Sequence, residues 1–420
     1  MFKESFLDKI LYRTKKLIPK SIFNFFQPAY HTLLAYTGAT LYGFSSRKLK
    51  VIGVTGTKGK STVTYLVSRI LEANGEAVAA IGSLGYKIKD KEWPNTLKMT
   101  MPGRFKLQRF LAQAKKAGCK YVVLEVTSEG IKQKRHLGIN FDCAVFTNIH
   151  REHIESHGSF EKYFAAKQEL FRLTKNIHIL NADDSNVELF SKFPSKHTMF
   201  YGIKRGDLKV DNINLGQNKS SFDIYGTSFE INLTGEFNVL NCLAALAVGA
   251  MYGIDLPKAK PILESVKAIP GRMEFVQREP FSVVVDYAHT PDSLEAVYKS
   301  LKTDKKLICV LGAAGGGRDR WKRPEFGRIA DQYCDEIILT NEDPFEESPE
   351  AIVDQISKGI KRDHIKIIDR RDAIKKAVSD AKPGDTVIIT GKGSETSMAV
   401  SGNKKLFWSD KKTVEELLQK

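Results

Sequence analysis

The sequence predicts an α/β protein with a central parallel-sheet domain built around a phosphate loop, a C-terminal doubly wound α/β domain, and a short helical segment in front of both. Two observations support this fold class. Short apolar strands alternate with helical segments in two successive stretches of the chain, and such alternation is typical of parallel sheets covered by helices. A glycine-rich loop, Gly56–Ser61, lies between the first strand and the first helix of this pattern. At 420 residues the chain is long enough for two or three domains.

Residues 1–48 form the predicted helical segment. It is rich in Lys and Arg, and its acidic residues are Glu4 and Asp8. Its apolar residues recur at helical spacing opposite the basic ones, which predicts a basic amphipathic helix. Two interpretations stay open: a helix packed on the next domain with a solvated basic face, or a peripheral contact with an anionic membrane surface.

Residues 49–270 form the predicted central domain. The pattern predicts strands at 51–54, 77–81 and 121–126, a helix at 62–73, a polar antiparallel excursion at 209–233 and a closing helix at 239–251. The strands are apolar throughout, as expected of a parallel sheet that is buried on both faces.

The loop Gly56-Thr57-Lys58-Gly59-Lys60-Ser61, followed by Thr62, is the predicted phosphate site. Its glycines let the backbone turn and point N–H groups at phosphate oxygens, while Lys60 adds a charge and Ser61 a hydroxyl for Mg²⁺. A strict Walker A motif would place Gly or Ala at position 54, which is Val. An ordinary glycine turn is the alternative interpretation. Asn218-Lys219 is followed by two serines, so the guanine-reading motif is absent and adenine is preferred.

Two strand ends supply candidate metal ligands. Glu125 ends the strand that begins at Tyr121, at the edge where α/β sheets bind their ligands. The strand that ends near Asn148 runs into a segment with His150, Glu152, His153 and His157. A solvated loop is the alternative for the histidines.

Residues 271–420 form the predicted second α/β domain, with strands at 282–285, 307–311, 336–339, 365–368 and 386–389. It has no phosphate loop of its own, so we expect it to deliver a substrate to the nucleotide of the first domain.

Composition narrows the remaining possibilities. The net charge of +16 suits nucleic acid, a membrane surface or a polyanionic substrate, and phosphate-rich substrates would account for much of it. The five cysteines are scattered and lack CxxC spacing, so we expect reduced core residues: Cys119, Cys143, Cys242, Cys309 and Cys334. The early apolar stretch at 22–43 is interrupted by polar residues and Pro28, and no cleavable signal pattern is present. A cytoplasmic protein is expected.

The chain resembles the Mur ligases, and within them the muramoyl-tripeptide synthetases, over roughly 370 residues from Lys50 onward. The resemblance rests on an ordered series of motifs: Gly56–Ser61, Glu125–Gly130, Thr147–Gly158, Lys167 before Leu170-Phe171, Phe237–Asn241, Gly271–Glu274, Asp286–Asp292 and Gly391–Gly393. It implies an ATP-dependent ligase that adds an amino acid, diaminopimelate or lysine, to UDP-N-acetylmuramoyl-L-alanyl-D-glutamate through an acyl-phosphate, with Mg²⁺ as cofactor. No nucleic-acid partner is expected, and the protein is expected to be a monomer.

The resemblance also implies residue roles. Lys60, Glu125, His153 and Lys167 would be catalytic, and the metal would be held by Ser61, Glu125, His153 and a carbamylated Lys167. The nucleotide would contact Gly56 to Thr62 together with Asn241, Arg272 and Asp286. The muramoyl-dipeptide would contact Thr100, Thr127, Ser128, Gln133 and Arg135, with Arg135 as the carboxylate partner. From the residues alone, Lys167 would be a surface lysine and Asp286 a strand-end cap.

Two departures from the family pattern affect the substrates. Diaminopimelate-adding members carry an arginine where this chain has Phe345, in the run Glu342-Asp343-Pro344-Phe345, and a histidine where it has Ser394. Asp343, Gly391 and Glu395 still match amino-acid contacts, so diaminopimelate stays ahead of lysine. The family's N-terminal UDP-binding domain is expected to be missing, with residues 1–48 in its place. We expect this segment to bind the substrate's diphosphate or a membrane surface.

Other functions on the same scaffold remain alternatives at this point. They are a folylpolyglutamate synthetase-like ligase, a muramyl ligase acting at another step, and a non-catalytic nucleotide-binding protein. Glu152 stands where the family has an aspartate, a change that keeps the charge.

Overall fold

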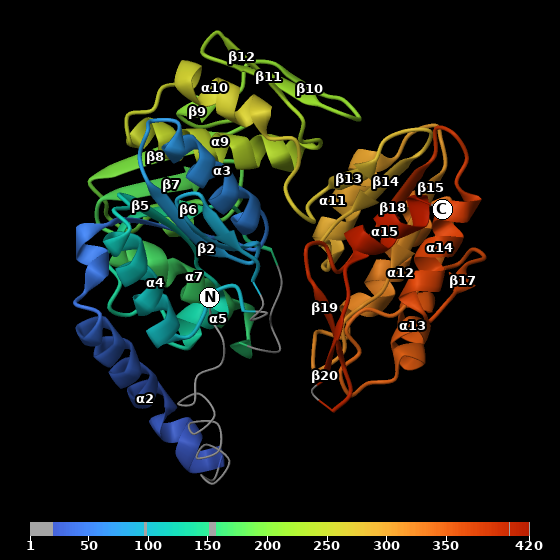
Figure 1. Cartoon of the computed structure of the whole chain (residues 1–420), viewed down its shortest axis with the longest axis horizontal. Coiled ribbons are helices and arrows are strands. Elements are labelled where there is room, and N and C mark those ends of the chain that lie inside the picture. Colours follow the sequence, from blue (N-terminus) through green and yellow to red (C-terminus); the bar gives the residue numbers. More distant parts are fainter. Residues whose placement is uncertain (1–19, 96–98, 151–156, 403, 420) are drawn as a thin grey trace. The chain divides into compact units, whose positions relative to one another are not determined.

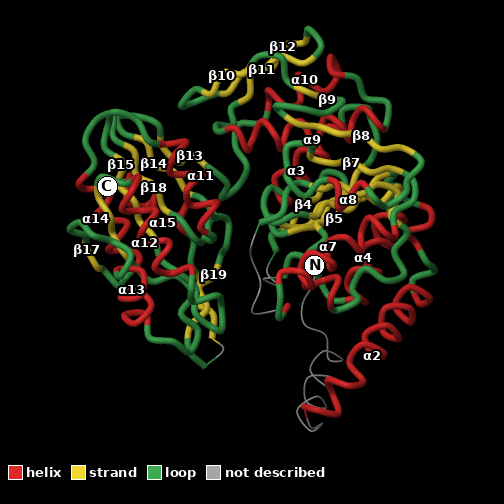
Figure 2. The backbone as a smooth tube through the Cα atoms, turned by 180° about the vertical axis from the view of Figure 1, so that it is seen from behind, coloured by secondary structure: helices red, strands yellow, loops and turns green. Residues whose placement is uncertain are grey.

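The computed structural model describes residues 20–95, 99–150, 157–402 and 404–419. It divides into two compact units. Figure 1 labels the helices and strands, and Figure 2 colours them by secondary structure. The first comprises the described residues of Met1–Ile149, Glu161–Val210 and Leu240–Leu263; the second comprises those of His150–Phe160, Asp211–Val239 and Glu264–Lys420. The boundaries at residues 48 and 270 stay predictions.

The first unit is built on a nine-stranded sheet with the order β4-β3-β2-β5-β1-β6-β7-β8-β9. The pairs from β2 through β5, β1, β6, β7 and β8 to β9 are parallel, while β3 and β4 form an antiparallel edge. The strand bounds are β1 Lys50–Thr55, β2 Val78–Gly82, β3 Gly85–Ile88, β4 Lys91–Trp93, β5 Tyr121–Glu125, β6 Phe141–Phe146, β7 Ile177–Asn181, β8 His197–Gly202 and β9 Leu208–Lys209. Every residue of the central strand β5 is buried, which explains its unbroken apolar sequence up to Glu125.

Helices cover this sheet: α2 Lys20–Leu41, α3 Lys60–Glu72, α4 Arg104–Lys116, α5 Ser128–Lys132, α7 Phe160–Leu173, α8 Glu188–Ser191, α9 Glu236–Met251 and α10 Leu256–Ser265, with a short 3₁₀ helix, η1, at Ser45–Lys48. The helix α2 packs against α4 (Figure 1). Its buried face carries Ala35 and Ala39, and small residues there let the two helices approach closely. The predicted amphipathic helix before residue 20 lies outside the described residues.

The predicted antiparallel excursion is confirmed as a three-stranded sheet of β10 Ile213–Leu215, β11 Ser220–Ile224 and β12 Thr227–Ile231. A tight turn at Tyr225-Gly226, both with positive φ, joins the last two strands. The rings of Phe222 and Phe229 stack across the pair at 5.2 Å between centroids, which fixes the strand register.

The second unit has a six-stranded sheet of order β13-β14-β18-β15-β16-β17, parallel except for the edge strand β13. Its strands are β13 Glu274–Gln277, β14 Ser282–Val285, β15 Leu307–Leu311, β16 Glu336–Leu339, β17 Ile365–Lys366 and β18 Thr386–Ile389, with a separate hairpin of β19 Ser397–Val400 and β20 Lys404–Phe407. The strand predicted at 365–368 is shorter than expected, because β17 ends at Lys366.

Helices lie on both faces of this sheet, as the doubly wound prediction requires. One core cluster contains apolar residues of α11 Pro291–Leu301, α12 Lys322–Tyr333 and α13 Pro349–Ser357; the other contains those of α14 Arg370–Asp380 and α15 Asp410–Leu418.

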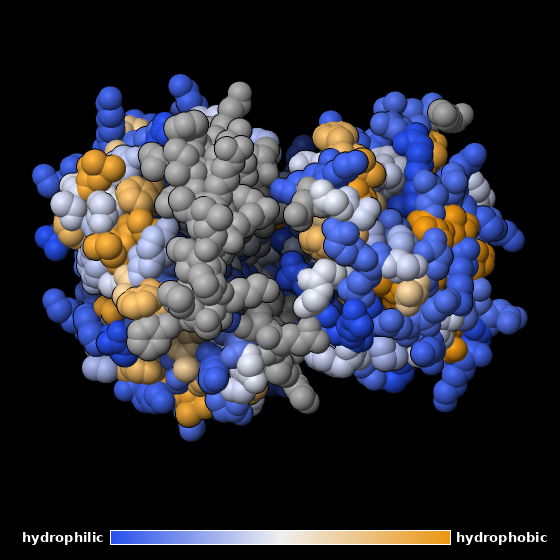
Figure 3. Space-filling view, turned by 90° about the horizontal axis from the view of Figure 1, so that it is seen from below, coloured by the Kyte–Doolittle hydropathy of each residue, from blue (hydrophilic) through white to orange (hydrophobic). Residues whose placement is uncertain are grey.

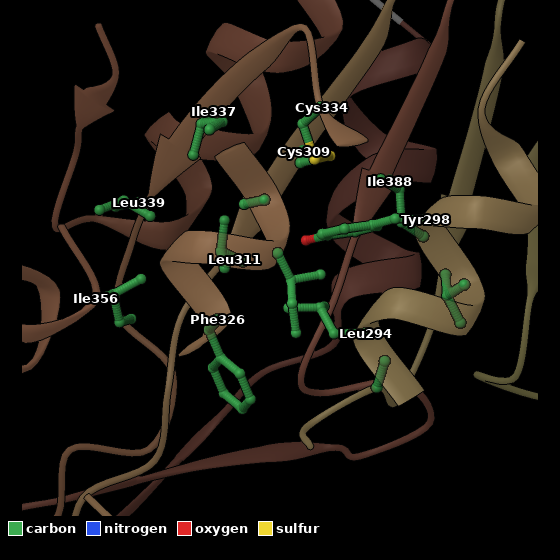
Figure 4. Packing of buried hydrophobic residues seen from close by; sticks show 14 of the residues in the cluster. Leu294, Tyr298, Cys309, Leu311, Phe326, Cys334, Ile337, Leu339, Ile356 and Ile388 are labelled. Carbon is green, nitrogen blue, oxygen red and sulfur yellow. A yellow bond between two sulfur atoms is a disulfide. The ribbon is translucent and has the colours of Figure 1, made fainter. Parts of the chain in front are cut away.

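One sequence prediction is wrong within the first of these clusters. Cys309 on β15 and Cys334, which follows α12, form a disulfide with a Cα–Cα distance of 6.1 Å (Figure 4). The pairing brings together residues 25 positions apart in the sequence, so no local spacing could indicate it. The other three cysteines are free and buried, as expected: Cys119, Cys143 and Cys242.

Candidate functional site

The loop between β1 and α3 is held by the end of the neighbouring strand β6. The backbone N–H of Lys58 donates to Asn148 Oδ1 at 2.8 Å, and that of Thr57 donates to the Asn148 carbonyl at 2.8 Å. The Thr147 hydroxyl donates to the Lys58 carbonyl at 2.6 Å. The Thr147-Asn148 pair therefore shapes the phosphate loop from outside.

Both glycines of the loop are required by their surroundings. Gly56 and Gly59 have positive φ, 150° and 81°. A Cβ at Gly56 would lie 1.9 Å from Thr147 Oγ1, and one at Gly59 would lie 2.4 Å from Asn241 Oδ1. The side chain of Asn241 on α9 thus lies directly against the loop, so the structure brings together these parts of the predicted nucleotide site. Thr62 is buried in the first turn of α3.

The end of β5 brings a carboxylate to the start of α3. Ser61 Oγ donates to Glu125 Oε1 at 2.5 Å, and the Ser83 backbone N–H donates to Glu125 Oε2 at 2.5 Å. Ser61 Oγ and Ser83 Oγ lie 2.6 Å apart. Hydroxyl and carboxylate oxygens are the ligands that Mg²⁺ prefers, so the chemistry of this group fits the predicted metal.

Two lysines donate to backbone carbonyls of the loop. Lys60 donates to the carbonyls of Gly56 and Thr57 at 3.0 and 2.8 Å, and Lys167 on α7 donates to the Gly56 carbonyl at 2.6 Å. Lys167 is 2% exposed, so the surface lysine expected from the residues alone is excluded. Tyr163, one turn earlier on α7, has its hydroxyl 2.9 Å from Thr57 Oγ1.

A cavity of about 310 Å³ opens beside these oxygens, between α3 and the β2–β4 edge of the sheet. Ser61 and Glu125 line one end, and Arg69, Tyr86 and Trp93 line the rest. The cavity borders the predicted metal ligands.

The histidine-rich segment after β6 is only partly described. His153 and Glu152 lie outside the described residues, so the predicted role of His153 stays a prediction. Within the described residues, no cluster of three or more His, Cys, Asp or Glu side chains is placed to hold a metal ion.

The predicted acyl-substrate residues share one region of the first unit. Thr127 caps α5 by accepting from the Gly130 backbone N–H at 3.0 Å, and Ser128 is buried beside it. Arg135 donates from Nη2 to Gln133 Oε1 at 2.7 Å. It also donates to the carbonyl of Met101, the residue that follows Thr100.

The second unit assembles its predicted residues around Lys392. This buried lysine donates to Asp343 Oδ1 and Oδ2 at 2.9 and 3.0 Å and to Glu395 Oε2 at 2.5 Å. Gly391 has a φ of 108°, and a Cβ there would lie 2.3 Å from Glu342 Oε2. We call Asp343, Lys392 and Glu395 the carboxylate–lysine cluster.

Arg272 and Asp286 lie in this same unit. Asp286 accepts from the Met273 and Ala288 backbone N–H groups at 2.7 and 2.6 Å, and its burial raises its pKa. These bonds fit the strand-end cap of the alternative interpretation. The guanidinium of Arg272 lies 4.3 Å from the ring centroid of Tyr287, whose hydroxyl donates to Glu395 Oε1 at 3.4 Å.

Buried charges in the second unit extend beyond the predicted residues. Arg370 forms a bidentate pair with Asp410, Nε to Oδ1 at 2.8 Å and Nη2 to Oδ2 at 2.7 Å. Burial raises the pKa of Glu342 to about 7, although Arg370 and Lys392 lower it.

Several partners in both sites were missed from the sequence. They are Ser83, Tyr163, Lys392, Glu342 and Arg370. Lys392 and Glu342 carried a signal, because they lie within the motif runs Gly391–Gly393 and Glu342–Phe345. The other three meet the site through tertiary packing.

Two family models match the chain: the Mur ligase middle domain over residues 54–249, and the Mur ligase glutamate ligase domain over residues 271–393. The chain is 38% identical over 399 residues to the UDP-N-acetylmuramoyl-L-alanyl-D-glutamate–2,6-diaminopimelate ligase of Thermosynechococcus vestitus, covering 91% of this chain and 79% of the relative. It is 39% identical over 386 residues to the ligase of the same name from Aquifex aeolicus, covering 90% and 79%.

Solved structures agree with these relatives. A 2,6-diaminopimelate ligase of the same description superposes with a TM-score of 0.62 at 31% identity, covering 88% of this chain and 78% of that one. MurF from Acinetobacter baumannii superposes with a TM-score of 0.71 at 18% identity, covering 93% and 81%, which shows a shared fold.

Proposed function

This chain belongs to the Mur ligase family, and from that premise we propose that it is an ATP-dependent ligase that joins an amino acid to UDP-N-acetylmuramoyl-L-alanyl-D-glutamate. The reaction would form an amide bond through an acyl-phosphate and release ADP and phosphate. The observation that carries the proposal is the phosphate loop, where the Ser61 hydroxyl meets the strand-end carboxylate of Glu125 at 2.5 Å. The names of the relatives supply the acyl substrate.

The loop residues would bind and orient the nucleotide phosphates. Backbone N–H groups at Gly59 and Lys60 lie at the N-terminus of α3, where the helix dipole favours anions. Lys60 would leave its carbonyl partners and donate to phosphate oxygens. Bound Mg²⁺ would neutralise phosphate charge, with Ser61 and Glu125 as its protein ligands.

Lys167 is proposed to support the metal after carbamylation. Its burial beside the Gly56 carbonyl favours that role over a surface one, since the modification would replace a buried cation by a carboxylate-like group. Mass spectrometry of the intact protein in bicarbonate buffer should show the added carbon dioxide, and Lys167→Gln should abolish it.

The second unit is proposed to hold the incoming amino acid. Asp343 and Glu395 lie on either side of Lys392, so their carboxylates are fixed in place before any substrate binds. Diaminopimelate remains ahead of lysine as that substrate, because the relatives from Thermosynechococcus vestitus and Aquifex aeolicus are named for it.

Measuring ADP release tests the proposed function. The protein is mixed with ATP, Mg²⁺, UDP-N-acetylmuramoyl-L-alanyl-D-glutamate and one amino acid at a time from a panel that includes diaminopimelate and lysine. We expect stimulation by one diamino acid and the corresponding tripeptide product by mass spectrometry. ADP release that no amino acid stimulates would contradict the proposal and favour a non-catalytic or different ligase role.

A peripheral contact of residues 1–48 with an anionic membrane surface stays a prediction. The described part of this segment exposes apolar side chains on α2: Phe26, Leu33, Tyr36 and Leu41. Figure 3 shows apolar patches among hydrophilic ones on the lower face of the molecule. No helix of the described residues is both long and apolar enough to cross a membrane. Flotation of the full chain and of a chain lacking residues 1–19 with anionic and neutral vesicles would test the contact.

A further inference from the structure

Two arginines converge on one residue at the edge of the predicted acyl-substrate site. Arg104 is the first residue of α4, and Arg135 follows α5. Arg104 donates from Nη2 to the backbone carbonyl of Gln133, and Arg135 donates from Nη2 to the Oε1 of the same residue at 2.7 Å. The two guanidinium groups are therefore close neighbours, although 31 positions separate them in the sequence.

Neither guanidinium forms an ion pair with a carboxylate among the described residues. Glu129, whose charge acts on Arg135, accepts a hydrogen bond from Gln133 Nε2 at 2.6 Å. The Nε atoms of both arginines are buried and have no hydrogen-bond partner. Buried or half-buried arginines are normally paired. Among the described residues, Glu129 is the one carboxylate whose charge acts on Arg135, so these residues supply less negative charge than the two guanidinium groups carry.

The N-terminus of helix α4 adds to the positive charge of this site. The first turn of α4 contains Arg104 and Lys106 and no acidic residue, and Gly103 provides no side-chain cap. Basic residues at a helix N-terminus oppose the helix dipole. Burial, and then the charge of Arg135, lower the pKa of Arg104 to about 10, so the group stays protonated at neutral pH. An arrangement that is unfavourable in the free protein becomes favourable when a ligand supplies an anion.

The location identifies the ligand class. Arg135 and Gln133 belong to the segment that continues from Glu125, the predicted metal ligand, through Thr127 and Ser128. Arg104 on α4 reaches this segment at Gln133. A terminal glutamate carries two carboxylates, of which one must stay free to attack phosphorus. Two guanidinium forks would bind the other one through charge-assisted hydrogen bonds.

We propose that Arg104 acts with Arg135 to bind the non-reacting carboxylate of the terminal glutamate, and that Arg104 makes the site selective for an acyl substrate that ends in a dicarboxylic residue. This inference rests on the proposed function, which it deepens by naming a specificity-determining residue.

The test compares two acyl substrates. One is UDP-N-acetylmuramoyl-L-alanyl-D-glutamate, and the other is the analogue in which the non-reacting carboxylate is a carboxamide. Arg104→Gln should raise KM for the glutamate substrate about 10-fold or more, the usual cost of a hydrogen bond to a charged group, with kcat nearly unchanged. For the carboxamide, KM of the Arg104→Gln variant should stay within about twofold of the wild-type value, because the carboxamide has no carboxylate for Arg104 to bind.

Two variants serve as controls. Arg109→Gln removes the same charge from an exposed position on the same helix and should change neither KM. Arg104→Lys keeps the charge but not the planar fork, so it should restore part of the affinity for the glutamate substrate. Equal rises of KM for both substrates, or no change for either, would overturn the inference.

A binding measurement separates this inference from the proposed function. If the wild-type protein turns over neither acyl substrate, the proposed function fails. The full chain is then titrated with N-acetyl-L-alanyl-D-glutamate and its carboxamide, followed by NMR or calorimetry. Preferential binding of the dianion that Arg104→Gln abolishes would support the anion site, and equal binding by both proteins, or no binding, would refute it.

Discussion

In the first unit, Lys60 and Lys167 donate to backbone carbonyl oxygens, whereas in the second unit Lys392 donates to the carboxylates of Asp343 and Glu395. The arginines divide in the same way. Arg104 donates to a carbonyl, while Arg370 is neutralised by Asp410 inside the protein. A carbonyl partner does not cancel a positive charge, whereas a carboxylate partner does.

This difference in partners suggests that charged side chains have different roles in the two units. Lys60, Arg104 and Arg135 of the first unit are proposed to act on phosphates and carboxylates of substrates, so their removal should cost activity. Arg370 and Asp410 of the second unit bond to each other in the folded protein, so removing one of them should cost stability. Substitutions of similar chemistry in the two units test whether the loss is one of activity or of stability.

The largest effect is expected at Arg370. Arg370→Gln would leave Asp410 buried without its counter-charge, and breaking such a pair costs about 3–5 kcal/mol. Urea denaturation followed by circular dichroism measures the loss. The neighbouring Arg371 pairs with Glu416 at the surface, 2.7 Å away, so Arg371→Gln should cost less than about 1 kcal/mol. Equal losses for the two variants would refute the contrast.

Lys60→Gln should behave in the opposite way. We expect kcat to fall about 10²–10³-fold, the usual loss when one electrostatic contact to the reacting group is removed. The free energy of unfolding should change by less than about 1 kcal/mol, because the hydrogen bonds from Lys60 to the Gly56 and Thr57 carbonyls contribute little net stability. ADP release and urea denaturation on the same preparation check both values. A variant as unstable as Arg370→Gln would mean that the phosphate loop is held together by this charge.

Phe345 tests the choice of amino acid in the second unit. It has a φ of 53°, and its ring packs where a Cβ on Gly316 would lie, 2.7 Å away. Phe345→Arg should raise the ratio of kcat/KM for diaminopimelate to that for lysine about tenfold, because a guanidinium binds the second carboxylate of diaminopimelate. Phe345→Leu removes the ring without adding charge and should leave this ratio unchanged.

The last prediction concerns the pH dependence of stability. Burial raises the pKa of Glu342 to about 7, above its ordinary value of 4.5. Between these values the unfolded chain has released the proton and the folded protein has kept it, so stability falls as pH rises through the window. The slope is at most about 1.4 kcal/mol per pH unit. In Glu342→Gln this component should disappear, which thermal unfolding between pH 5 and pH 8 would reveal as a flatter profile.

Much of the fold could be predicted from the sequence, because the information is local. The apolar strands at 282–285 and 307–311 end where the structure ends them, because each apolar run stops there: Asp286 follows the first and Gly312 the second. The segment before residue 20 stays a prediction, and the disulfide between Cys309 and Cys334 was missed because it depends on how β15 and the end of α12 pack.

The candidate site was likewise predicted where the information is local and missed where it depends on tertiary packing. Glu125 was expected as a metal ligand from its place at a strand end, and it does lie against Ser61. Ser83 was not expected, because it lies in no recognised motif. It follows β2, and the pairing of β2 with β5 brings it to Glu125. Arg104 matched no motif, and its relation to Arg135 requires α4 and α5 to be in place.

The contact of α2 with the rest of the first unit limits how freely pieces of this enzyme can be exchanged with those of its relatives. A Cβ on Gly138 would lie 2.6 Å from the Cβ of Ala39, and one on Gly38 would lie 3.5 Å from the ring of Phe105, the neighbour of Arg104. The helix therefore braces the backbone on both sides of the arginine pair. A chimera that joined a segment of a relative directly to β1 would lose this brace, so a junction placed before α2 is the one that would preserve the acyl-substrate site.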